Sequence, residues 1–161
     1  MKKDVKTYDD FLVNVIPDIC GFVRETHDAM LRNSCTFKVT TAKSGLVLSY
    51  ILPKSKRIIF NYVFRKQGLI IRIYGDNIAR YFDFLTTLPE NMISAIVSAP
   101  MCKRLANPSS CNPRCPLGYV FEISGEGYES CRYSSFMFEV KEENYKAVRE
   151  FISREMKERA G

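Results

Sequence analysis

Apolar residues recur at three- and four-residue intervals between positions 7 and 33, which is the spacing of one buried helix face. Thr7 and Asp10 form an approximate capping box, with Asp in place of the usual Glu, so we expect the helix to begin there. Pro17 lacks an N–H and cannot lie inside a helix without cost. The pattern therefore predicts a break and a second helix that starts at Pro17 and stops at Asn33.

After residue 34 the apolar spacing changes from helical to alternating, as in a half-buried strand. Short polar connections separate four such segments, and this arrangement is typical of an antiparallel meander. The four predicted strands span residues 35–41, 46–52, 58–64 and 69–74.

The second half of the chain mixes both periods and contains no internal repeat or low-complexity linker. It predicts helices over 76–88 and 89–99, an ordered loop over 101–116, strands near 118–124 and 132–140, and a closing helix with an apolar stripe from Tyr145 to Met156. We therefore expect one α+β domain over residues 1–161. Its antiparallel sheet has about six strands, with the N- and C-terminal helices packed on one face.

Composition excludes several classes of protein. The 161 residues include 11 Phe and 9 Tyr, enough aromatic area for a core, which argues against disorder. No apolar run approaches the ~18 residues of a membrane helix. The N-terminal residues have no apolar signal-peptide segment, so we expect a cytoplasmic protein without membrane contact, whose thiols are reduced.

Four of the six cysteines lie within thirty residues: Cys102, Cys111, Cys115 and Cys131. Structural zinc takes four tetrahedral ligands, usually with pairs two to four residues apart, and Cys111 and Cys115 have that spacing. Neighbouring Lys and Arg side chains would lower the thiol pKa values and offset the charge of a four-thiolate site. The cluster therefore predicts a structural zinc site as the only cofactor.

Two other interpretations of these cysteines stay open. Free cysteines are often small buried hydrophobic residues with no chemical role. Alternatively, Cys111 and Cys115 form a disulfide or a redox-active pair, which would make the protein a thiol redox protein. Cys20 and Cys35 fall on predicted apolar positions, and we expect both in the core.

The positive charge is concentrated in the meander. Residues 32–80 hold ten Lys and Arg and one Asp, net +9, whereas the rest of the chain is −3, within a total of +6. Lys38, Arg65 and Arg72 project from strands, and Tyr50, Tyr62 and Tyr74 lie nearby in the sequence. Basic charge beside aromatic rings on a sheet is one way to bind single-stranded nucleic acid. The same surface would suit a small anionic ligand, or the charges protect strand edges.

Motifs for catalysis are absent from the sequence. It contains no Gly-x-Ser-x-Gly, phosphate loop or dinucleotide fingerprint, and His27 is the only histidine. Enzyme activity thus has no positive support, and the sequence leaves it open. The leading interpretation is a small binding module.

Two family resemblances add to this interpretation. The run Tyr8-Asp-Asp-Phe-Leu12, with Ile16-Pro17 and the following helix and meander, resembles the small bacterial YdhG-like proteins over residues 7–100. That resemblance implies a helix-covered antiparallel sheet and, in one branch, frataxin-like iron handling. The acidic helical patch for iron delivery is not evident here. The blocks Cys102-Lys-Arg-Leu, Cys111-Asn-Pro-Arg-Cys115 and Cys131-Arg-Tyr are similar to an uncharacterised bacterial family, with no activity attached.

Overall fold

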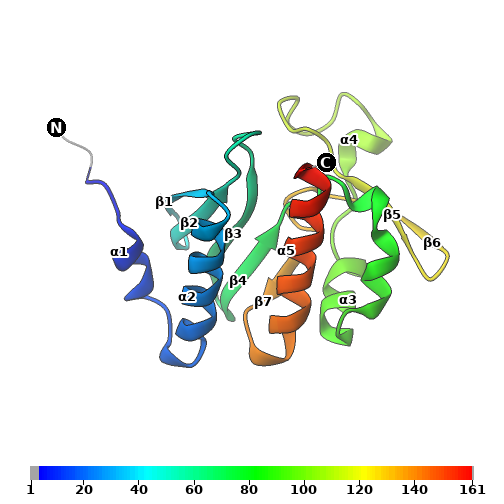
Figure 1. Cartoon of the computed structure of the whole chain (residues 1–161). Coiled ribbons are helices and arrows are strands. Elements are labelled where there is room, and N and C mark those ends of the chain that lie inside the picture. The colour runs from blue at the N-terminus through cyan, green and yellow to red at the C-terminus, as the bar shows by residue number, and fades with distance from the viewer. Residues whose placement is uncertain (1–3, 161) are drawn as a thin grey trace.

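Two long helices, α2 (Pro17–Arg32) and α5 (Tyr145–Ala160), lie side by side over a five-stranded antiparallel sheet (Figure 1). The structure, a computed structural model, describes residues 4–160. Met1 to Lys3 lie outside the described residues. They belong to the N-terminal segment in which the sequence shows no apolar signal-peptide stretch. The sheet order is β1 (Thr36–Ala42), β2 (Gly45–Ile51), β3 (Ile58–Arg65), β4 (Gly68–Ile73) and β7 (Met137–Glu139).

The local signals at the N-terminus produce the predicted helices. Thr7 Oγ accepts from the Asp10 backbone N–H at 3.1 Å, and the Asp10 carboxylate accepts from the Thr7 N–H at 2.7 Å, so α1 (Tyr8–Leu12) begins with a capping box. The break, the start of α2 at Pro17 and its cap at Asn33 are also confirmed.

The two faces of the sheet differ because side chains alternate along each strand. Tyr50, paired with Phe60, and Tyr62, paired with Leu48, face α2, where Tyr50 Oη contacts His27 Nδ1 at 2.8 Å and Tyr62 Oη contacts Thr26 Oγ1 at 2.7 Å. All of these strand side chains are buried, and the core beneath them is continuous with the apolar stripes of α2 and α5. The predicted α+β class and antiparallel sheet are confirmed.

The predicted single sheet of about six strands needs one correction. β5 (Tyr119–Ile123) and β6 (Glu126–Ser130) form a separate two-stranded sheet. Ser124 and Gly125 both have positive φ, 51° and 85°, as in the tight turns that favour hairpins. The chain therefore reverses within two residues and pairs as β6, where a longer turn was predicted.

The predicted helix over 76–88 is replaced by two 3₁₀ helices, η1 (Ile78–Arg80) and η2 (Phe82–Thr87). The backbone N–H of Asn77 donates to the Glu155 carboxylate at 3.0 Å, so a contact with α5 anchors the start of the segment.

The remaining helical elements are α3 (Glu90–Val97), α4 (Lys103–Ala106) within the predicted loop, and η3 (Glu142–Asn144). Within residues 4–160, no helix is long and apolar enough to cross a membrane.

Candidate functional site

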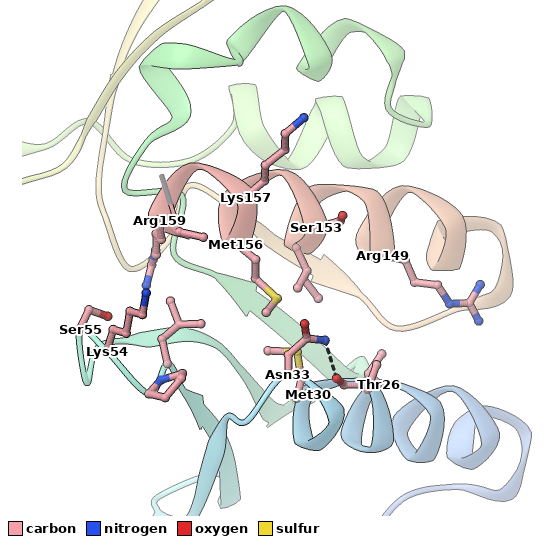
Figure 2. A pocket seen from close by; sticks show the side chains of 15 residues that line it. Thr26, Met30, Asn33, Lys54, Ser55, Arg149, Ser153, Met156, Lys157 and Arg159 are labelled. Carbon is pink, nitrogen blue, oxygen red and sulfur yellow. Dashed lines mark hydrogen bonds between the residues drawn. The ribbon is translucent and has the colours of Figure 1, made fainter.

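A groove of about 610 Å³ lies between α2 and α5 and reaches the loop between β2 and β3 (Figure 2). Its volume lies within the range of about 300–1,000 Å³ that small-molecule sites occupy. Both helices lie on the same face of the sheet, and residues 52–55 of the loop after β2 complete the lining.

Helical periodicity explains which side chains line the groove. On α2 they are Thr26, Ala29, Met30 and, at the cap, Asn33, which share one face at intervals of three and four residues. The α5 wall repeats this spacing and includes Ser153. Ala29 and Ser153 are small residues on the two helices, so space remains between the helices where larger side chains would meet.

The inner surface of the groove is apolar. Met30, Leu52 and Ile152 have 3%, 9% and 6% of their surface exposed, and Met156 is half-buried above them. The uncharged polar lining consists of hydroxyl groups and the Asn33 amide, which donates to the Ala29 carbonyl at 2.8 Å. Such a surface favours an apolar portion of a ligand.

One end of the groove is closed by direct contacts between the helices. The rings of Phe22 and Tyr145 stack with centroids 4.1 Å apart and planes 5° apart. Arg149 reaches across from α5, donates to the Glu25 carboxylate at 2.7 Å and lies over the Phe22 ring at 5.2 Å. These contacts hold α2 against α5 at this end.

The other end of the groove carries Lys54 and Arg159, and Figure 2 shows them at the opposite end from Arg149. The side chain of Arg159 is 8% exposed and held by four acceptors: Glu155 at 2.7 Å, Asp76 at 3.4 Å, and the carbonyls of Tyr74 and Ile58. Asp76 also accepts from Arg132. Arg159 is therefore a fixed part of the groove wall.

The sequence interpretation missed this groove, although one signal for it was present. The helical stripes of α2 and α5 were recognised as core-facing, but Ala29 and Ser153 were not considered within them. Small residues within an apolar stripe indicate either close helix packing or a hollow. Only the separation of the helices distinguishes these outcomes, and periodicity carries no information about it.

The four clustered cysteines occupy different environments. Cys102 is buried, Cys111 is exposed, and Cys115 and Cys131 are half-buried. All are free thiols, and within residues 4–160 no three Cys, His, Asp or Glu side chains converge on one metal position. The zinc site and the Cys111–Cys115 redox pair stay predictions.

Cys102 and Cys131 are brought near each other by backbone pairing. The Cys102 N–H donates to the Glu129 carbonyl and the Cys131 N–H to the Pro100 carbonyl, both at 2.8 Å. The Cys102 sulfur accepts from the Gly118 N–H at 3.3 Å. Cys102 thus joins three segments of the chain.

The predicted anion-binding residues Lys38, Arg65 and Arg72 all lie on the sheet face away from α2 and α5. Lys38 and Arg72 belong to one cross-strand row, with Ser49 and Asn61 between them, and are separated by three strand spacings, about 14 Å. Arg72 donates to the Tyr133 carbonyl at 2.8 Å and approaches Asn61 Oδ1 at 3.4 Å. Anion binding on this face stays a prediction.

The aromatic part of the nucleic-acid hypothesis does not match the structure. Tyr50 and Tyr62 have no exposed surface and lie under the helices, and Tyr74 is 7% exposed. Because strand alternation places Tyr50 and Tyr62 on the face opposite Lys38 and Arg72, their rings cannot stack bases bound to those cations.

The only histidine belongs to the core packing. His27 stacks on the Tyr8 ring with centroids 3.7 Å apart, and burial lowers its pKa.

Comparison of the chain with protein-family models, with curated proteins and with solved structures finds no match.

Proposed function

We propose that the protein is a small binding module that holds a largely apolar small molecule in the groove between α2 and α5. The observation that carries this proposal is the groove of about 610 Å³ over the apolar side chains of Met30, Leu52, Ile152 and Met156. Burial of apolar ligand surface contributes about 25 cal/mol per Å², so such a surface supplies affinity without a catalytic group.

A cytoplasmic location belongs to the same proposal. Its support is chemical: all six cysteines are free, as expected of a protein in a reducing compartment.

The test uses N-phenyl-1-naphthylamine, a neutral apolar dye whose fluorescence rises in apolar surroundings. We expect saturable binding of one dye per chain to the folded protein. Ser153→Phe fills the groove from an exposed position on α5 and should abolish dye binding. Lys146→Phe adds the same ring to an exposed position of the same helix that does not line the groove, and should bind dye normally.

Circular dichroism and thermal unfolding would show that both variants fold. If folded Ser153→Phe bound the dye as tightly as the unmodified protein, the groove would not be the binding site and the proposal would be wrong.

A further inference from the structure

The lining of the α2–α5 groove carries charge of one sign. Four cationic side chains reach it, those of Lys54, Arg149, Lys157 and Arg159. Among residues 4–160, no Asp or Glu lines it. The lining residues therefore offer no carboxylate to a cationic ligand, whereas an anionic ligand would meet groups of opposite charge.

Three of the four cations already have another role. Arg149 is paired with Glu25, and Arg159 with Glu155 and Asp76. In Figure 2 the ammonium group of Lys157 extends away from α2, on the outer side of α5. Lys157 and Arg159 also lie in the last turn of α5, where cations stabilise the helix dipole.

Lys54 has none of these roles. It lies in the loop between β2 and β3, outside any helix, directly after Leu52 and Pro53, which line the groove. Within the described part of the chain it forms no ion pair with a carboxylate. An exposed cation beside an apolar cavity is suited to an anionic group whose carbon chain enters that cavity.

We infer that the groove takes an amphiphilic anion: a hydrocarbon chain or ring carrying one carboxylate or phosphate, with the apolar part on Met30, Ile152 and Met156 and the anionic group at Lys54. This inference rests on the proposed function and names its ligand class. Arg159 lies at the same end of the groove, but Glu155 and Asp76 offset its charge, so Lys54 is the cation left for the ligand. Binding of this ligand forms no covalent bond. It consists of burial of the apolar part and a charge-assisted hydrogen bond to the anionic group.

The experiment compares three eight-carbon probes that differ only in the head group: octanoate, 1-octanol and octylamine. Each is titrated against protein loaded with N-phenyl-1-naphthylamine. We expect octanoate to displace the dye with about twofold to fivefold higher affinity than octanol, as one exposed ionic contact allows. Octylamine should bind more weakly than octanol.

Two matched variants locate the charge. Lys54→Gln should reduce octanoate affinity to nearly that of octanol, while octanol affinity stays within about twofold. Lys38→Gln removes the same charge from an exposed position on the opposite face of the sheet and should leave both affinities unchanged. Octyl phosphate distinguishes the two anions: whichever of it and octanoate binds more tightly identifies the preferred head group.

The outcomes separate the two proposals. If dye and octanol bind but octanoate has no advantage, or if Lys38→Gln weakens octanoate as much as Lys54→Gln does, the ligand class is wrong and the binding module stands. If neither dye nor any of the probes binds, the proposed function itself is wrong. Binding to phosphatidylglycerol vesicles without binding of the monomeric probes would also overturn the inference, in favour of a membrane surface.

Discussion

The hydroxyl of Tyr81 donates a 2.6 Å hydrogen bond to Oε1 of Glu155, a carboxylate with no exposed surface. The same oxygen accepts from the Asn77 N–H, while Oε2 accepts from the Asn77 amide and from Arg159. This network binds α5 to the segment that follows β4. It also fixes the guanidinium of Arg159 in the groove wall, so stability and the proposed site share these contacts.

Glu155→Ala should lower the free energy of unfolding by about 3 kcal/mol, because it leaves the buried guanidinium of Arg159 with one carboxylate fewer and frees three other donors. Urea unfolding measures the loss. Glu150→Ala is the control on the same helix: Glu150 forms an exposed pair with Arg154, so its removal should cost less than about 0.5 kcal/mol. Equal losses would mean that the buried network contributes little.

Gly118→Ala and Gly21→Ala should change stability in opposite directions. A Cβ at Gly118 would overlap the Ser130 carbonyl oxygen and lie 2.6 Å from the Cβ of Cys102, so the backbone at Ser130 must shift, at a cost of roughly 1–3 kcal/mol. Gly21 is inside α2 and a Cβ there meets no atom within 4 Å, so alanine should stabilise the protein by about 0.5–1 kcal/mol. Thermal unfolding of both variants checks the two signs, and a neutral Gly118→Ala would contradict the packing argument.

Stability should fall in mildly acidic solution because of His27. Burial lowers the pKa of His27 below its ordinary value of 6.5. Below pH 6.5 the unfolded chain therefore takes up a proton that the folded chain does not, and the free energy of unfolding decreases until the pH reaches the folded-state pKa. Above pH 6.5 this contribution is complete.

Urea unfolding between pH 7.5 and 5.5 tests this dependence, and His27→Gln should show a shallower slope than the unmodified protein. The comparison uses the slope of the free energy of unfolding against pH and not its absolute value, because the substitution also disturbs the contact with Tyr50. Asp10 does not interfere, because its pKa is lowered from 3.8 by hydrogen bonds from Thr7 and lies below this range. An unchanged slope in the variant would refute the assignment to His27.

Thiol reactivity should separate the cysteines. In the folded, metal-free protein Cys111 is exposed and should react rapidly with a disulfide reagent, whereas Cys35 is buried and burial raises its pKa, so it should react slowly. Cys111→Ser should remove the fast phase and Cys35→Ser should leave it. Persistence of the fast phase in Cys111→Ser would show that another thiol is the reactive one.

The zinc prediction from Cys102, Cys111, Cys115 and Cys131 has its own measurement. Elemental analysis of the folded protein, purified without added metal, should find about one zinc per chain, and a chelator should release it together with newly reactive thiols. Less than about 0.1 zinc per folded chain would refute the site.

Short-range signals explain what was predictable about the fold. The capping box of Thr7 and Asp10, the start of α2 at Pro17 and the alternation of the meander act between residues a few positions apart. The turn after β5 was predicted too long, because a serine with positive φ at Ser124 has only a weak sequence signal. The 3₁₀ segment was missed because its apolar spacing also suits an α-helix.

The candidate site was less accessible from sequence because it depends on distances between helices. Lys38, Arg65 and Arg72 are on one sheet face, but Tyr50 and Tyr62, which were expected beside them, lie on the other. Lys54 was counted only as part of the meander charge. Its position at the end of the groove depends on α5, about a hundred residues further along the chain.

The order of residues alone thus decides where α1, α2 and the meander strands begin, which of their faces are apolar, and that the positive charge belongs to the meander. These properties follow from backbone geometry and local hydrogen bonding. The tertiary structure decides that α2 and α5 leave a hollow between them, that Glu155 and Asp76 fix Arg159 beside it, and that Lys54 remains unpaired within the described residues. Each of these depends on packing between segments distant in sequence, and local patterns carry no record of that packing.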